Sequence, residues 1–208
     1  MQRYDKALAD LNRAIELDPA DALDIASRGE TYRRMERYEE ALADFSRAIE
    51  LNPGYTSAIA SRGQVYQAMQ RYEEALADLS RAIELDPGCA SAIASRGETY
   101  RLMERYEEAL ADLNRVIELN PVDARGIASR GEIYRLRKRY DEALADFNRA
   151  IELNPGYTSA IASRGQVYQA MQRYEEALVL ATSLYDDPAA GLCGDAPAGL
   201  DEHPEHGL

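Results

Sequence analysis

The four-residue phrase Ala-Leu-Ala-Asp returns along this chain at a constant interval of 34 residues, as from Ala7 to Ala41. It begins at Ala7, Ala41, Ala75, Ala109 and Ala143, and a degraded copy begins at Ala177. A fixed period of this length is typical of repeat proteins, in which similar units stack in a row. The 208 residues therefore indicate one elongated array rather than one or two globular domains.

Each unit is predicted to contain two amphipathic helices. In the unit from Thr56 to Cys89, apolar or small residues recur at steps of three and four, which places them on one helical face. They are Ile59, Gly63 and Tyr66 in the first helix, and Tyr72, Ala75, Leu76, Leu79, Ala82 and Ile83 in the second. A proline stops each second helix because it has no amide donor and disfavours helix before it. These prolines are Pro19, Pro53, Pro87, Pro121 and Pro155.

The pattern resembles the tetratricopeptide repeat family over residues 1 to about 187. In the unit from Thr56 to Cys89 the family signature falls on Gly63, Tyr66, Ala75, Leu79, Ala82 and Pro87. The resemblance implies an all-α fold, a right-handed superhelical solenoid of helix-turn-helix repeats. It also implies a non-enzymatic protein-protein interaction scaffold, whose first helices line a concave groove for an extended peptide or a partner helix.

The predicted organisation is a lone helix at about 3–17, followed by five helix pairs and a tail. The pairs span about 22–55, 56–89, 90–123, 124–157 and 158–187. Residues 41–76 and 143–178 differ only at Ser46 and Asn148, which indicates duplication of a three-unit block. The tail, 188–208, is acidic and rich in Gly, Ala and Pro, so we expect it to be disordered. Its two histidines, His203 and His206, lack a clear further ligand set, and we expect no metal site there.

Two positions depart from the family pattern. The turn between the helices carries Glu36, Gln70, Glu104, Lys138 and Gln172 where the family commonly has glycine. If that position needs a positive φ, each substitution costs on the order of 1 kcal/mol. The residue before the glycine of the first helix is always arginine, where the family usually has leucine. These arginines are Arg28, Arg62, Arg96, Arg130 and Arg164.

An arginine inside the helix packing needs an anionic partner. The recurrent acid is the Asp of the Ala-Leu-Ala-Asp phrase, and we predict that each arginine pairs with the Asp of the preceding unit. The predicted pairs are Arg28–Asp10, Arg62–Asp44, Arg96–Asp78, Arg130–Asp112 and Arg164–Asp146. The alternative is an Asp–Arg pair within one helix, such as Asp44–Arg47.

The resemblance to the family also places candidate partner-binding residues in the groove. Its floor would be made of alanine and serine, such as Ala60 and Ser61, and long polar side chains would follow along each first helix. These candidates are Glu30, Arg33, Gln64, Gln67, Glu98, Arg101, Glu132, Arg135, Gln166 and Gln169. They could hydrogen-bond along the backbone of a bound chain. The competing interpretation is a solvated face, because Glu and Arg three residues apart can pair with each other.

Composition argues against several other classes of function. The repeats contain no histidine, no Ser/His/Asp set and no Gly-rich phosphate loop, so we expect no enzyme and no cofactor. A net charge of −13 disfavours nucleic acid as a partner. Cys89 and Cys193 form no metal or disulfide framework. No apolar run could span a membrane and no signal segment is evident, so we expect a cytoplasmic protein.

The two ends of the repeat array carry apolar residues that seek cover. The first helix lacks a helix before it, and the last helix is more apolar than the other copies. The candidate self-association residues are Leu8, Leu11, Val179, Leu180, Leu184 and Tyr185. Closed dimers or head-to-tail stacking would follow, whereas a tail folded back over the last helix would leave a monomer. The alternative functions are thus a self-associating repeat array, or the interaction segment of a larger signalling protein.

Overall fold

The computed structural model describes the backbone of residues 2–185 and the side chains of residues 3–175, and every element in it is an α-helix. This confirms the all-α prediction. The chain forms two compact units, Met1–Val167 and Tyr168–Leu208. The helices over the described residues are α1 (Gln2–Leu17), α2 (Ala22–Arg34), α3 (Tyr38–Leu51), α4 (Thr56–Ala68), α5 (Tyr72–Leu85), α6 (Ala90–Leu102), α7 (Tyr106–Leu119), α8 (Ala124–Leu136), α9 (Tyr140–Leu153) and α10 (Thr158–Tyr185).

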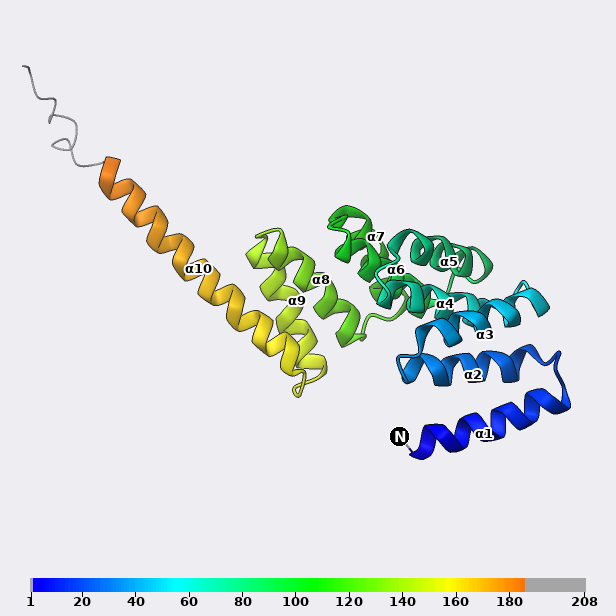
Figure 1. Ribbon diagram of the computed structural model, residues 1–208. Coiled ribbons are helices and arrows are strands. Elements are labelled where there is room, and N and C mark those ends of the chain that lie inside the picture. Colours follow the sequence, from blue (N-terminus) through cyan, green and yellow to red (C-terminus); the bar gives the residue numbers. More distant parts are fainter. Residues whose placement is uncertain (1, 186–208) are drawn as a thin grey trace, which may run out of the picture. The chain divides into compact units, whose positions relative to one another are not determined.

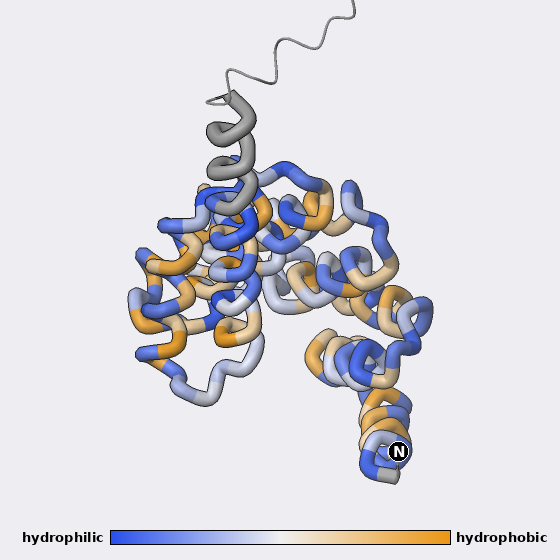
Figure 2. The backbone as a smooth tube through the Cα atoms, turned by 90° about the vertical axis from the view of Figure 1, so that its left-hand side faces the viewer, coloured by the Kyte–Doolittle hydropathy of each residue, from blue (hydrophilic) through white to orange (hydrophobic). Residues whose placement is uncertain are grey.

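The helices of the first unit pack in consecutive pairs, as a solenoid requires (Figure 1). Helices α2 and α3 form one hairpin, and α4–α5, α6–α7 and α8–α9 form the next three. Each second helix also packs against the first helix of the following hairpin. Apolar and polar residues alternate around each helix instead of gathering in separate segments (Figure 2). Each hairpin therefore buries its apolar stripe against its neighbours.

A glycine in each first helix allows the two helices of a hairpin to approach closely. A Cβ atom added to Gly63 would lie 2.9 Å from Cγ of Leu79, and one added to Gly29 would lie 3.1 Å from Cβ of Asp44. Both distances are shorter than ordinary van der Waals contact. The side chain that fills this site is fully buried, with Phe45 1% and Leu79 0% exposed. The glycine is therefore required by packing.

The turn inside each hairpin uses a left-handed residue that is not glycine. Its φ is 59° at Glu36, 60° at Gln70, 58° at Glu104 and 59° at Lys138. The strain that the sequence predicts at this position is therefore present, at about 1 kcal/mol per turn. The turn also closes a hydrogen bond from the backbone N of Arg71 to the carbonyl of Tyr66, at 2.8 Å. Hairpin packing offsets the backbone cost.

The arginine before each glycine pairs with an aspartate, but the predicted partner is wrong. The guanidinium of Arg62 donates from Nε and Nη2 to both carboxylate oxygens of Asp78, at 2.7 and 2.9 Å. Asp78 belongs to the same hairpin, so neither Asp44 of the preceding unit nor a pair within one helix is correct. The same bidentate pair joins Arg28 to Asp44, Arg96 to Asp112 and Arg130 to Asp146.

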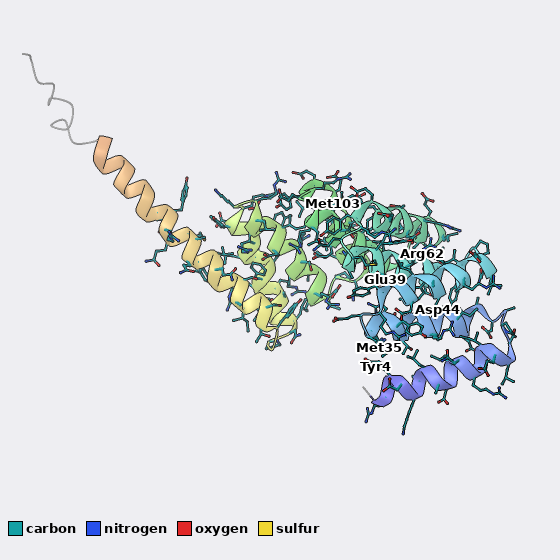
Figure 3. The ribbon with its side chains drawn as sticks, in the orientation of Figure 1. Tyr4, Met35, Glu39, Asp44, Arg62 and Met103 are labelled. Carbon is teal, nitrogen blue, oxygen red and sulfur yellow. The ribbon has the colours of Figure 1, made fainter. Side chains whose placement is uncertain are left out.

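The third donor of the same guanidinium reaches the preceding unit. Nη1 of Arg62 donates to Oγ of Ser46 at 3.1 Å, and Nη1 of Arg28 donates to Oδ1 of Asn12 at 2.8 Å. Figure 3 labels Arg62 on α4 and, on α3, Asp44, which stands two residues before Ser46. Two residues differ by about 200° around a helix, so Asp44 faces its own first helix while Ser46 faces the next one. Each arginine thus links two units, through a neutral side chain on one side.

The last copy departs from the predicted fifth helix pair. Residues 158–185 form one helix, α10, and the turn expected at Gln172 lies inside it. Two conditions that offset the strained turn elsewhere are missing there. Leu180 stands where the other copies have the aspartate, and no described residues form a following first helix. Extending the helix avoids a left-handed residue that costs about 1 kcal/mol.

Several predictions fall on residues that the structure leaves undescribed. The tail at 188–208, with His203 and His206, lies outside the described residues, as do the side chains of Val179, Leu180, Leu184 and Tyr185. Among the helices that the structure does describe, none combines the length and the apolar character needed to cross a membrane.

Candidate functional site: the inner trough

The first helices of the hairpins form the inner face of the first unit. Helix α4 contacts α2 and α6, and α6 contacts α8, while the second helices α3, α5, α7 and α9 make no such contacts with one another over the described residues. A row in which only one set of helices touches is curved toward that set. The groove candidates on α2, α4, α6 and α8 therefore lie on a concave surface.

The charged candidates pair with each other along single helices, as the competing interpretation expects. Nε and Nη2 of Arg33 donate to the two carboxylate oxygens of Glu30 at 2.7 and 2.8 Å. Arg101 and Glu98 form the same bidentate pair at 2.7 and 2.6 Å. Arg135 and Glu132 repeat the arrangement on α8. The inner face therefore presents neutralised pairs instead of free charges.

Hydrogen bonding keeps these groups ionised. Burial alone would raise the pKa of Glu30, but the hydrogen bonds from Arg33 and Arg34 outweigh it and lower that pKa below its ordinary value. The hydrogen bond to Glu30 likewise raises the pKa of Arg33. Hydrogen bonds from Glu98 and Glu132 raise the pKa of Arg101 and Arg135. No proton is available here for acid-base chemistry near neutral pH.

The glutamine candidates of α4 bridge two repeats. Nε2 of Gln64 donates to Oγ of Ser95 at 3.0 Å, and Nε2 of Gln67 donates to the Ser95 carbonyl at 3.2 Å and to Oγ1 of Thr99 at 3.0 Å. These amides link α4 to α6. Gln166 and Gln169 are exposed on α10, and Gln169 belongs to the second compact unit.

Three hollows open between the first helices. The largest, about 450 Å³, extends from Gln67 past Ser95 and Ser129 to Tyr157. A second of about 250 Å³ shares Ser129 and Tyr157 with it and continues to Ser163. The third, about 290 Å³, lies between α2 and α4 around Ser27, Tyr55 and Ser61. We call the first two together the inner trough. Its floor is small and polar, as predicted, with Ala94, Ser95, Ala128 and Ser129 as members.

Sequence reasoning missed two tyrosines that line these hollows. Tyr55 and Tyr157 each precede a first helix and take part in the hollow beside it. The corresponding residues in the other units are Asp21, Cys89 and Asp123. This position changes from unit to unit while the residues around the glycine stay constant. Variation at one position inside an otherwise repeated motif is the signal that could have identified it.

The N-terminal self-association candidates are split by the structure. Leu8 is buried, 9% exposed, and offers no surface. Leu11 is only partly buried, although its equivalents Phe45, Leu79 and Leu113 are at most 3% exposed. Tyr4 is also exposed, at 38%, near the N-terminal end of α1 (Figure 3). One face of α1 therefore lacks the cover that other second helices have.

No group of three or more His, Cys, Asp or Glu side chains could hold a metal ion within the part of the chain that the structure describes. The buried carboxylates Asp44, Asp78, Asp112 and Asp146 are all engaged by arginine. The arrangement offers surfaces for binding, and the described side chains show no constellation of nucleophile and base.

Comparison with known proteins gives a consistent result. A family model described as tetratricopeptide repeat matches residues 26–55, 57–89, 90–123 and 124–157, and a second model of that description matches residues 1–21. No curated protein sequence matches the chain.

Solved structures resemble the chain in fold. YrrB, described as a TPR protein with an unusual peptide-binding site, is 26% identical, with a TM-score of 0.66, covering 79% of this chain and 84% of its own. TTC0263 from Thermus thermophilus, described as a thermophilic TPR protein, is 24% identical, with a TM-score of 0.68 and coverage of 81% and 92%. MamA from Desulfovibrio magneticus RS-1 is 20% identical, with a TM-score of 0.68 and coverage of 74% and 87%.

Proposed function

Because the chain belongs to the tetratricopeptide repeat family, we propose that it is a binding scaffold that holds an extended peptide or helix of a partner protein in the inner trough. The observation that carries the proposal is the continuity of two hollows from α4 across α6 and α8 to the start of α10. A peptide-binding site is named for the similar protein YrrB, which supports the same class of ligand here.

The chemistry of the trough defines the kind of peptide it suits. Its charged groups are paired, so a strongly acidic or basic peptide gains little from Glu98–Arg101 or Glu132–Arg135. The floor residues Ser95 and Ser129 are small and let a backbone approach closely, while Tyr157 offers an aromatic side wall. We therefore propose recognition of a peptide through its backbone and small or apolar side chains.

Peptides selected from a random library against the intact chain test the proposal. Ser129→Arg fills the trough, and we expect it to weaken the selected peptides at least about tenfold, or roughly 1.4 kcal/mol. Ala111→Arg is the matched control, because Ala111 is exposed on the second helix α7 and lies outside the trough. Titration calorimetry measures both. Equal affinity for the two variants would contradict the trough as the binding site.

Self-association is the second candidate function. The observation that favours it is the incompletely covered face of α1, where Tyr4 is 38% exposed and Leu11 is only partly buried. Sedimentation of the intact chain over a concentration series tests it. A single monomeric species throughout would reject this candidate and leave trough binding unaffected.

A further inference from the structure

Two helix faces in the first unit each lack the partner that completes a hairpin. Helix α1 is a second helix by sequence, with Asp10 in the place of Asp44 and Leu11 in the place of Phe45. The start of α10 is a first helix, with Arg164 and Gly165 in the places of Arg62 and Gly63. In the complete hairpins these positions form the bidentate ion pair and the close helix contact.

The face of α1 is unsatisfied in both charge and packing. Asp10 is exposed and forms no ion pair with any described residue, whereas Asp44 and Asp78 are each 7% exposed and paired. Ala7 is partly exposed, although the equivalent alanines of the four complete hairpins are fully buried. Together with Leu11, these residues make up the face that we call the α1 face.

The start of α10 shows the complementary deficit. Arg164 keeps only its bond to the preceding unit, from Nη1 to Oδ1 of Asn148 at 2.8 Å. Its equivalents bind an aspartate 16 residues further along, and that position is Leu180, which offers no acceptor. A Cβ added to Gly165 would meet nothing within 4 Å. Ile161 is 40% exposed, against 0% for Ile59. Ile161, Arg164 and Gly165 form the α10 face.

We propose that the α1 face of one copy docks on the α10 face of a second copy and completes a hairpin between chains. Asp10 takes the bidentate position on Arg164, and Leu11 enters the space above Gly165. The register is that of the complete hairpins, because all six residues occupy repeat positions that already meet within the chain, as Arg62 meets Asp78 and Gly63 meets Leu79. The contact is heterologous, so it builds a ring or an open filament.

Charge complementarity selects this occupant over the alternatives. A second copy brings a carboxylate to an arginine that has no carboxylate partner among the described residues, and it brings a leucine to an open glycine. The segment that follows Arg164 in its own chain brings Leu180 to the same place and leaves the guanidinium without an acceptor. The proposal rests on the second candidate function, self-association, and specifies its surface.

A charge-swap mixing experiment on the full chain tests the proposal. In Asp10→Arg the two faces carry like positive charges, and in Arg164→Asp they carry like negative charges. Each variant alone should sediment as a monomer at concentrations where the unaltered chain assembles. An equimolar mixture should assemble again, because each junction then joins Arg to Asp. Restoration on mixing cannot arise from misfolding, and circular dichroism of each variant verifies its helix content.

Asp5→Arg is the matched control, since it makes the same charge change at an exposed residue about 140° around α1 from Asp10. It should leave assembly unchanged. If the unaltered chain is monomeric at every concentration, both self-association and the docking are overturned. If Asp10→Arg alone assembles as well as the unaltered chain, the docking is overturned while self-association stands.

Discussion

The same stretch of sequence occurs twice in this chain and folds in two ways. Residues Thr56–Leu76 and Thr158–Leu178 are identical. The first copy ends α4 at Ala68, turns through Gln70 with a φ of 60° and begins α5 at Tyr72. The second copy continues as the single helix α10. The comparison teaches that the hairpin is not encoded by its turn. It depends on the next three residues, which are Ala77-Asp78-Leu79 in one copy and Val179-Leu180-Ala181 in the other.

The largest effect should come from giving the interior copy the triplet of the last one. In the variant Ala77→Val, Asp78→Leu, Leu79→Ala, Arg62 loses its carboxylate and the Leu79 site becomes a cavity beside Gly63. We expect the free energy of unfolding in urea to fall by roughly 3–6 kcal/mol. The reciprocal variant, Val179→Ala, Leu180→Asp, Ala181→Leu, should raise it. Equal stability of the interior variant and the original chain would refute the dependence on the triplet.

The two glycines should respond to alanine with opposite signs. In Gly63→Ala the new Cβ meets Leu79 at 2.9 Å, which should destabilise the chain by about 1–3 kcal/mol. In Gly165→Ala the Cβ meets nothing, so the helix propensity of alanine should stabilise it by about 0.5–1 kcal/mol. Thermal unfolding of the two variants side by side measures the difference. The same sign for both would mean that the two sites are packed alike.

The aspartates of the interior hairpin and of α1 should differ in the same manner. Asp78→Asn removes the charge of the bidentate pair with Arg62 and should reduce stability by about 1–2 kcal/mol. Asp10→Asn, measured at dilutions where the chain is monomeric, should change it by less than about 0.5 kcal/mol, because Asp10 is exposed and pairs with no described residue. Urea titration distinguishes them, and a substantial loss in Asp10→Asn would reveal a partner for that carboxylate.

The smallest effect concerns the turn residue itself. Gln70→Gly relieves a left-handed residue and should stabilise the chain by about 0.5–1 kcal/mol. Gln172→Gly places glycine inside α10 and should weaken that helix by a similar amount. Amide hydrogen exchange around each site locates the change. Faster exchange at the α4–α5 turn in Gln70→Gly would contradict the strain at that residue.

Much of the fold could be predicted because local rules repeat at a fixed period. The glycines and small apolar residues identify the helix faces, and the prolines limit the second helices. The self-neutralised pairs Glu30–Arg33 and Glu98–Arg101 follow from their spacing on one helix. A periodic sequence predicts what happens inside each helix because those contacts depend on spacing alone.

The errors arise where a contact depends on which side of a helix meets which neighbour. Arg62 lies nearly midway in sequence between Asp44 and Asp78, so spacing alone could not choose between them. Packing chooses Asp78, and Ser46 takes the remaining donor. The tyrosine of the trough, Tyr157, was missed because it acts outside its own helix pair. The helical continuation through Gln172 was missed because the repeat was assumed to repeat its environment.

The arginine that reaches both its own hairpin and the one before it has a consequence for how such a chain changes over time. Every junction uses the same three donors in the same register, whether the neutral acceptor is Asn12, Ser46 or Asn148. Copying or deleting a whole unit therefore recreates a valid junction with no compensating substitution, while any other insertion length breaks one. Gene duplication can adjust the length of the array freely, and the near-identical blocks at 41–76 and 143–178 are the trace that such a process leaves.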